Sequence, residues 1–553
     1  MTSRIDPQYG MVIDLNSCVG CQTCTIACKH ANDTPPGVQW RKVIDVELGQ
    51  FPNVERLFLV TGCQHCANPP CVPVCPTGAT RQRSDGLITM NYDTCIGCGY
   101  CAVACPYQAR TIVHQQDWYY GEPTAQEEHV AQKNRIGVAN KCTFCIDKLD
   151  DGLAQGLTPG VDADATPACA NSCIATAIHF GDFNDPDSSI SQLAAGNDAF
   201  QMHQDLGTDP QIKYLYGLPD STPGRDSTAD DINEEAYLDP TNPMVGQPQT
   251  FWDIRACLNF TFGGASTGLV IMAWLAHITG GLTQEALTII NLLAGVGMAI
   301  GLFSVFLEIA RKARFLYVLR RPHSSWMTRE TYAVAVFYPA LFAQLLWPSE
   351  ILNLIVVLAA AAFLYCQGRI LHAARGIPAW RVKQMPWMLI LTGLFEGAGL
   401  LAIAADLIPG LEDGAIVAAG CGGVLAAINA ILWQRYLSKA TVNNIPPLAM
   451  RVLKEQTLGL RIIGHVLPLL GFSIFLCLTP DQPIIAAIAG FCAVVGGASW
   501  KRTVITRACH QQGFALPKVP QRGSGTFAAP IRMGRAVSYT HLRAHETRHD
   551  LVC

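Results

Sequence analysis

The chain has 553 residues, half of them hydrophobic, and a formal net charge of -4. Several domains are expected at this length, and so small a charge gives no reason to expect nucleic acid as a partner. No apolar signal-peptide core follows Met1 and no twin-arginine pair precedes the first cysteine, so we expect no export by the N-terminus.

Sixteen of the 23 cysteines lie in four groups of four before residue 174. The groups, in chain order, are Cys18, Cys21, Cys24 and Cys28; Cys63, Cys66, Cys71 and Cys75; Cys95, Cys98, Cys101 and Cys105; and Cys142, Cys145, Cys169 and Cys173. The first and third follow C-x2-C-x2-C-x3-C, in which the fourth cysteine ligates a different cluster from the first three. Thiolates are soft ligands that suit iron–sulfur clusters. The alternative is zinc held by C-x2-C pairs, but zinc does not need the x3 cysteine that ends every group.

These groups, with the last split by a loop and followed by HFGDFNDPDS, resemble the four-cluster electron-transfer subunits of the dimethyl sulfoxide reductase superfamily. The resemblance covers about residues 8–190 and implies an α+β tandem of ferredoxin-like units with four [4Fe–4S] clusters. Ile174 departs from the pattern, because many relatives have proline there. By the implied exchange of fourth ligands, cluster one takes Cys18, Cys21, Cys24 and Cys173; cluster two takes Cys142, Cys145, Cys169 and Cys28; cluster three takes Cys95, Cys98, Cys101 and Cys75; and cluster four takes Cys63, Cys66, Cys71 and Cys105.

Three lysines lie beside these ligands in the sequence: Lys29, Lys141 and Lys148. A nearby cation stabilises the more negative, reduced cluster and raises its reduction potential. The alternative is an ordinary solvated lysine, and the sequence leaves both interpretations open.

After the four-cluster domain, expected over 1–190, an acidic and proline-rich connector is expected over 191–250, followed by an eight-helix membrane domain over 251–503. An apolar helix of about 20 residues crosses a hydrocarbon layer of about 30 Å. The connections between spans two and three, four and five, and six and seven carry Lys and Arg, as does the segment after span eight, whereas the other connections carry none. Positive loops stay inside, so we expect a multi-pass protein of the cytoplasmic membrane whose cluster domain faces the cytoplasm. The eight apolar stretches are 256–278, 286–307, 331–347, 351–367, 386–406, 414–434, 459–478 and 482–500.

Two ionisable residues inside these stretches mark candidate sites: Glu396, in the middle of the fifth, and His465, near the cytoplasmic end of the seventh. Quinone chemistry moves protons together with electrons, so it needs a carboxylate or an imidazole near the head group. The alternative for Glu396 is a protonated carboxyl hydrogen-bonded between helices. Glu308 and Asp406 lie near helix ends and are expected at the interface.

A cytoplasmic tail is expected over 504–535, and the last 18 residues, AVSYTHLRAHETRHDLVC over 536–553, resemble a translated sequencing-library adapter. We therefore discount His541, His545 and His549 as metal ligands, although their spacing fits one face of a helix.

Apolar helices joined to a four-cluster domain resemble the quinone-reactive anchor subunits of the same superfamily, on topology and on segments such as FWDIRACLNFTFGGASTG. The resemblance implies an electron-transfer and anchor subunit that connects membrane quinone to a separate catalytic subunit with a molybdenum or tungsten pterin; we expect no catalytic residue in this chain. The connector and TPACANSC are similar to phenylacetyl-CoA:acceptor oxidoreductase subunits, in which electrons run to quinone. The alternatives are a polysulfide, thiosulfate or sulfoxide reductase with reverse flow, a redox-driven proton pump, and a redox sensor without turnover.

Overall fold

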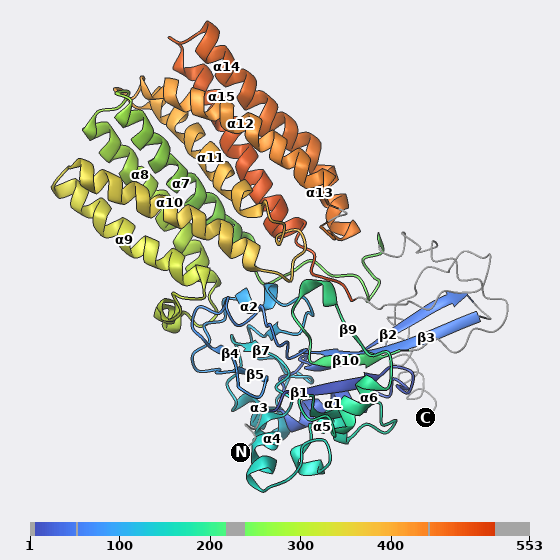
Figure 1. Cartoon of the computed structure of the whole chain (residues 1–553). Helices are drawn as coiled ribbons and strands as arrows, with labels where there is room; N and C mark the ends of the chain where they lie inside the picture. The colour runs from blue at the N-terminus through green and yellow to red at the C-terminus, as the bar shows by residue number, and fades with distance from the viewer. Residues whose placement is uncertain (1–5, 51–52, 217–237, 441–442, 515–553) are drawn as a thin grey trace, which may run out of the picture.

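The computed structural model describes residues 6–50, 53–216, 238–440 and 443–514 (Figure 1). An N-terminal domain of short strands and helices lies against one end of a bundle of long helices. The two parts match the change in composition along the chain, from cysteine- and proline-rich to apolar.

The N-terminal domain is organised around a four-stranded sheet in the order β8-β1-β10-β9. The central strand β1 (Tyr9–Asp14) pairs antiparallel with β8 (Ile178–Asp182) and parallel with β10 (Ile212–Leu215), so that Met11 lies opposite Phe180 and Ile212. The sheet ends at β9 (Phe200–Gln201). Strands β9 and β10 fall within the stretch expected as the connector, and the N-terminal domain therefore takes in residues up to 215.

Short elements carry the cysteine groups around this sheet. Three two-stranded antiparallel sheets are formed by β2 (Arg41–Gln50) and β3 (Asn53–Gly62), β4 (Thr80–Gln82) and β5 (Ile88–Met90), and β6 (Thr111–Ile112) and β7 (Ala139–Asn140). The helices are α1 (Thr23–Ala31), α2 (Tyr100–Val103), α3 (Ala125–Ala131), α4 (Ile146–Ala154), α5 (Ala168–Asn171) and α6 (Ser189–Ala195), with 3-10 turns η1 (Ala163–Ala165) and η2 (Gln204–Leu206).

The C-terminal domain is an all-α bundle, as expected. Its elements are α7 (Ile254–Ile278), α8 (Gln284–Glu308), the 3-10 segment η4 (Lys312–Arg320), α9 (Trp326–Leu346), α10 (Glu350–Ala373), α11 (Met385–Leu407), α12 (Gly414–Ser438), α13 (Pro447–Arg461), the π-helical turn η5 (Ile462–Val466), α14 (Leu467–Leu478), α15 (Pro483–Arg502) and a second π-helical turn, η6 (Thr503–Arg507).

Among the described residues, seven helices are long and apolar enough to cross a membrane, by length and composition. One of them runs without a break through α13, η5 and α14, over Pro447–Leu478. The third expected span, 331–347, forms α9, which packs against α10 but has Arg329 and Glu330 near its N-terminal end and is not among the seven. An eighth span at α9 therefore stays a prediction.

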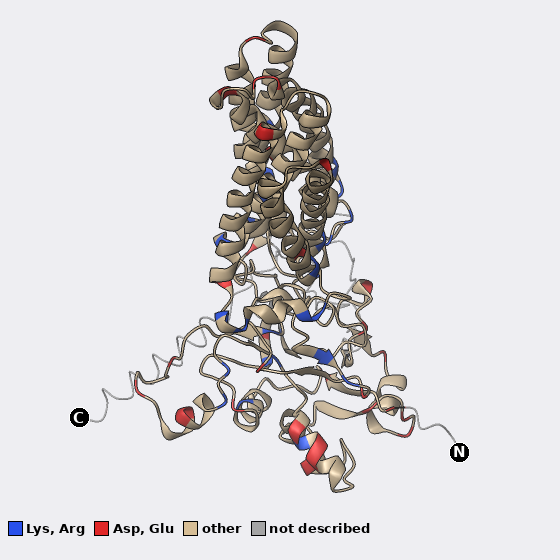
Figure 2. Ribbon diagram, turned by 90° about the vertical axis from the view of Figure 1, so that its left-hand side faces the viewer, with Lys and Arg blue, Asp and Glu red and all other residues tan. Residues whose placement is uncertain are grey.

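Lys and Arg are sparse over most of the bundle and gather at its end next to the N-terminal domain and on that domain itself, whereas Asp and Glu also mark the opposite end of the bundle (Figure 2). Large apolar side chains cover the outer surface of the bundle, for example Phe303, Val424 and Phe491, each about 60% exposed. Such a surface is unfavourable in water and suits a hydrocarbon solvent.

The two domains share one hydrophobic core, which runs from Cys71, Cys75, Cys95 and Cys101 into the helices. Tyr100 donates a hydrogen bond to the Ile370 carbonyl at 2.8 Å, and the Trp252 indole N–H donates to the Cys98 carbonyl at 2.9 Å. The bundle is therefore anchored directly on the third cysteine group.

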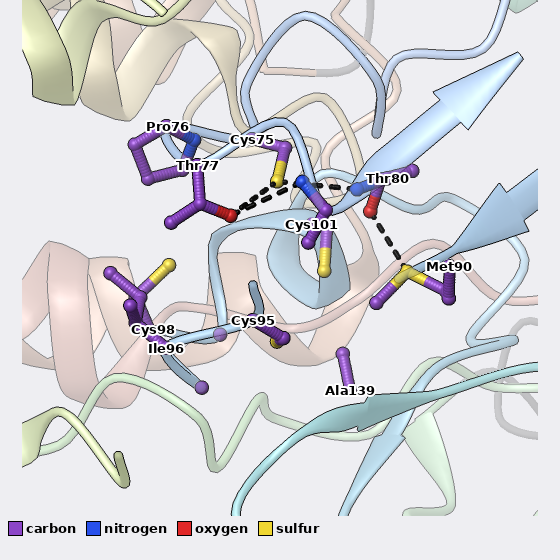
Figure 3. A pocket seen from close by; sticks show the side chains of 13 residues that line it. Cys75, Pro76, Thr77, Thr80, Met90, Cys95, Ile96, Cys98, Cys101 and Ala139 are labelled. Atoms are coloured by element: carbon purple, nitrogen blue, oxygen red, sulfur yellow. Dashed lines mark hydrogen bonds between the residues drawn. The ribbon is translucent and has the colours of Figure 1, made fainter. Parts of the chain in front are cut away.

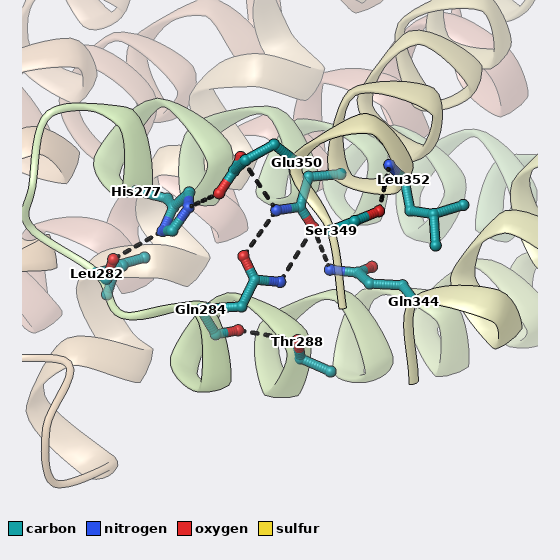
Figure 4. Close-up of polar contacts among 9 residues, drawn as sticks. His277, Leu282, Gln284, Thr288, Gln344, Ser349, Glu350 and Leu352 are labelled. Atoms are coloured by element: carbon teal, nitrogen blue, oxygen red, sulfur yellow. Dashed lines mark hydrogen bonds and ion pairs between the residues drawn. The ribbon is translucent and has the colours of Figure 1, made fainter. Parts of the chain in front are cut away.

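A polar group lies at the opposite end of the bundle, where α7, α8, α9 and α10 meet (Figure 4). His277 Nε2 lies 3.0 Å from Glu350 Oε1, and Asn353 donates to Gln284 at 2.8 Å. Gln344 donates to Asn353 at 2.6 Å. These bonds satisfy the side chains of Gln344 and Asn353, which would otherwise be buried unpaired between helices.

Candidate functional site

The third cysteine group and Cys75 line one cavity at the base of the bundle (Figure 3). Its walls include Cys75, Cys95, Cys98 and Cys101, which are the four ligands expected for cluster three. The loop between Cys95 and Cys101 bends through Gly97 and Gly99, each with φ near +72°, a conformation that glycine adopts without strain. A Cβ at Gly97 would lie 2.2 Å from the Gly137 carbonyl oxygen, so this turn also needs glycine for space.

The other three cysteine sets are also brought together, each with its fourth thiol from a distant group. Cys173 lies beside Cys18 and Cys24. Cys28, on α1, lies beside Cys142, Cys145 and Cys169. Cys105 lies beside Cys71 and Cys63. These neighbours are the ones implied by the exchange of fourth ligands.

Within the described residues, no three His, Cys, Asp or Glu side chains are close enough to hold a single metal ion. The thiols of each set are spread more widely than ligands of one zinc ion would be. Burial raises the pKa of Cys101 to about 12 and that of Cys142 to about 11, so both thiols are neutral at pH 7. Metal binding must therefore displace protons from them.

Three buried cations lie among the cysteine sets: Arg41, Arg110 and Lys141, which are 0%, 4% and 0% exposed. The Arg110 Nη2 lies 3.1 Å from the Cys71 Sγ. The Arg41 Nη2 lies 3.9 Å from the Cys169 Sγ, and its Nε and Nη1 have no hydrogen-bond partner among the described residues.

A buried cation without a counter-charge costs several kcal/mol. These positions therefore fit anionic groups held by the thiols, such as iron–sulfur clusters, better than they fit neutral thiols. Sequence reasoning missed both arginines, because neither belongs to a cysteine group.

The lysines beside the ligands differ in their surroundings. Lys141 is fully buried, and its Nζ donates to the Cys142 carbonyl at 2.7 Å. Lys29 is half-buried and donates to the Pro35 carbonyl at 2.8 Å, and Lys148 is also only partly exposed. The solvated-lysine alternative is therefore wrong for Lys141.

In the helical domain, Glu396 on α11 is fully buried and forms an ion pair with Lys501 on α15, with Nζ 2.5 Å from Oε2. Lys501 also donates to the Phe260 carbonyl on α7 at 2.9 Å. The sequence places Lys501 in the segment after the last span, but α15 continues to Arg502 and Lys501 is 1% exposed, so that placement is wrong. The hydropathy of a segment cannot identify a lysine whose partner lies on another helix.

His465 lies in the π-helical turn η5 and lines a second pocket with Asn429, Trp433 and Trp500. Gly497, also in this pocket wall, lies directly against Glu396, because a Cβ there would be 2.4 Å from the Glu396 Oε1. The structure thus brings the two ionisable residues from separate spans to one place. Glu308 lies at the end of α8 as expected but is 7% exposed, and Asp406 lies one residue before the end of α11.

Comparison with known proteins identifies the class of the N-terminal domain. Residues 54–120 match the family model of the 4Fe-4S dicluster domain. A selenate reductase subunit of Mesobacillus selenatarsenatis is 41% identical over 225 residues, which are 38% of this chain and 72% of that protein. A sulfite dehydrogenase subunit of Allochromatium vinosum is 38% identical, over 38% of this chain and 82% of that protein.

The chain therefore belongs, through its N-terminal part, to the family of 4Fe-4S electron-transfer subunits of dimethyl sulfoxide reductase-type enzymes. The menaquinone reductase iron–sulfur cluster-binding subunit of Nitratidesulfovibrio vulgaris is also similar, at 35% identity over 38% of this chain and 88% of that protein. The similarity ends before the helices, so the joining of this domain to seven apolar helices is a feature of the chain that these relatives do not explain.

Proposed function

We propose that this chain is the electron-transfer and membrane-anchor subunit of an oxidoreductase complex. A cytoplasmic catalytic subunit with a molybdenum or tungsten pterin would exchange electrons with membrane quinone through it. Four [4Fe–4S] clusters, held by the four cysteine sets, would supply one-electron carriers along this route. The supporting observation is the continuous buried core that joins Cys75, Cys95 and Cys101 to the apolar helices.

The residues around the cysteine sets support this role by excluding water and by fixing charge. Twelve of the sixteen cysteines are at most 9% exposed, and Arg41, Arg110 and Lys141 place positive charge between them. A fixed cation in a dry site stabilises an added electron without reorganisation of solvent.

Glu396 and His465 are the candidate proton-exchange groups at the quinone. Reduction of a quinone consumes two electrons and two protons, and oxidation of the quinol releases them, so each residue would handle one proton. Support comes from one pocket, which His465 lines and whose wall residue Gly497 lies directly against Glu396. The basic end of the bundle supports a cluster domain on the cytoplasmic face.

The substrate of the complex follows from the same proposal. TPACANSC and the connector favour phenylacetyl-CoA oxidation, with electrons flowing to quinone. The alternative is reduction of polysulfide, thiosulfate or sulfoxide, in which electrons flow from quinol to the catalytic subunit. A redox-driven pump needs a continuous polar chain across the bundle. Among the described residues, no hydrogen bond joins the polar group at His277 and Glu350 to the one at Glu396 and Lys501, so the pump receives no support.

Metal analysis of protein purified without oxygen tests the clusters. We expect about sixteen irons per chain, four for each cluster; zinc, or far fewer irons, would overturn the proposal.

Glu396→Gln tests the quinone role: we expect slower quinol-driven reduction of the clusters with unchanged cluster spectra. Glu412→Gln, an exposed change in the connection between α11 and α12, is the matched control. Unchanged turnover in Glu396→Gln would remove Glu396 from the mechanism.

A further inference from the structure

The pocket beside Glu396 lies where α11, α12, η5 and α15 meet. Its polar side chains are those of Thr392, Asn429, Trp433, His465 and Trp500, and the rest of its wall is apolar or glycine. Gly464 and Gly496 bring the backbones of η5 and α15 together, since a Cβ on Gly496 would lie 2.3 Å from the Gly464 Cα. This close contact between η5 and α15 forms one wall of the pocket, and side chains form its other walls.

Two tryptophans give this pocket unused hydrogen-bond donors. Trp433 and Trp500 are 2% and 7% exposed, and neither indole N–H has a partner among the described residues. A buried donor without an acceptor costs free energy, and buried polar groups are almost always paired. Because an indole can only donate, the missing partner must carry acceptor oxygens or nitrogens.

His465 gives the pocket one acceptor. Its Nδ1 lies 2.9 Å from the Leu460 carbonyl oxygen. A carbonyl oxygen only accepts, so Nδ1 carries the proton of the neutral ring and Nε2 is left with a free lone pair. The irregular π-helical turn that holds His465 is of the kind often found at functional sites.

The surroundings of the pocket select the kind of ligand. Around His465, Leu458, Ile462, Ile463 and Val466 point outward with 41–69% exposure, which places η5 against lipid. On the inner side, Trp433 and Trp500 belong to the same buried core as Cys95 and Cys101. The ligand is therefore reached from the bilayer and lies on the side of the bundle that is continuous with the third cysteine group.

Two aromatic residues fill this core between the third cysteine group and the pocket. The Trp252 ring stacks on the Trp380 ring, with centroids 5.8 Å apart, and Trp380 donates to the Val504 carbonyl at 2.8 Å. Val504 lies one turn beyond Trp500 on the same continuous helix. Trp252 in turn donates to the Cys98 carbonyl, so packed side chains connect the two sites without an intervening solvent layer.

We infer that this pocket binds the head group of a lipid-soluble 1,4-quinone, and that the Trp433 and Trp500 N–H groups donate to its carbonyl oxygens. The inference rests on the proposed function and adds to it the location of the quinone site and two residues that bind the quinone. His465 Nε2 accepts a proton when quinol is oxidised and returns it when quinone is reduced. Glu396, behind Gly497, takes the second proton, and a cluster held by the third cysteine group would take up or supply the two electrons one at a time.

Binding of 2,3-dimethyl-1,4-naphthoquinone to the full-length protein in lipid nanodiscs tests this inference, measured by titration calorimetry against empty nanodiscs. Trp433→Phe and Trp500→Phe keep an aromatic ring and remove the donor. We expect each to raise Kd about 2- to 12-fold, as loss of one hydrogen bond does. Trp387→Phe is the matched control, because this tryptophan lies on the neighbouring α11 but is 60% exposed, and its replacement should leave Kd unchanged.

The location is tested separately with a photoreactive azido derivative of the same quinone. Peptides that contain 429–433 or 496–500 should be labelled, and the unlabelled quinone should compete. If both tryptophan variants bind as the unchanged protein does, or if the label lies elsewhere, the pocket inference fails while the proposed function stands. If the unchanged protein binds no quinone and quinol reduces none of its clusters, both fail. Cluster spectra of each variant verify that it has folded.

Discussion

Arg110 places its positive charge in direct contact with a cysteine sulfur. Its Nη2 lies 3.1 Å from the Cys71 Sγ, and the side chain is 4% exposed. Replacing Arg110 with Gln removes one positive charge and keeps a polar side chain of similar reach. Because a reduced cluster is more negative than an oxidised one, loss of the cation should lower the reduction potential of the cluster that we propose for Cys63, Cys66, Cys71 and Cys105.

The size of this effect follows from Coulomb's law. With a charge about 6 Å from the cluster centre and an effective dielectric constant of about 20, the interaction is about 2.8 kcal/mol, or about 120 mV for a one-electron couple. Water entering the site would reduce this figure, so it is an upper value.

Redox titration of the full-length protein, followed by electron paramagnetic resonance, measures the potentials of the four proposed clusters in one experiment. We expect one potential to fall by up to that amount in Arg110→Gln, and most of the fall to be reversed in Arg110→Lys, which keeps the charge. Arg41→Gln is the internal comparison, since it should shift the cluster beside Cys169 instead. Four unchanged potentials in Arg110→Gln would refute the electrostatic reasoning.

Two further predictions follow from the packing. Cys28→Ser should disturb the same cluster signal as Cys145→Ser, because both thiols lie in one set, and different signals in the two variants would contradict the exchange of fourth ligands. Gly497→Ala should displace the Glu396 carboxyl, which lies 2.4 Å from the added Cβ, and slow quinol oxidation several-fold without loss of iron; Gly420→Ala, which meets nothing within 4 Å, should have no effect in the same assay.

The cysteine sets were accessible to sequence reasoning because the chemistry of cluster ligation fixes their spacing. The spacing within CVGCQTC is local, and the exchange of the fourth ligand follows from the family resemblance. The apolar helices were accessible for a similar reason, since a bilayer of fixed thickness demands apolar runs of fixed length. Seven of the eight expected stretches form helices of this kind.

Contacts between distant residues could not be read in the same way. Arg41 and Cys169 are 128 positions apart, and Glu396 and Lys501 are 105 apart. No local pattern distinguishes a lysine that pairs inside the bundle from one in a positive loop. The basic connection after α8 shows the same ambiguity, because Arg311 and Arg314 donate to the carbonyls of Ile136 and Tyr92 in the N-terminal domain at 2.8 Å. Their charge thus has a docking role in addition to any effect on orientation.

After the last helix, the chain returns to the N-terminal domain. Pro248 and His510 form a bridge, and Gln108 donates to the Gln512 carbonyl at 2.9 Å. The segment before the first helix of the bundle therefore pairs with the segment after the last helix, and the latter is bound to the N-terminal domain. A single cut in the backbone between residues 216 and 238 would leave the halves associated, so the covalent link sets their stoichiometry while noncovalent contacts hold their alignment.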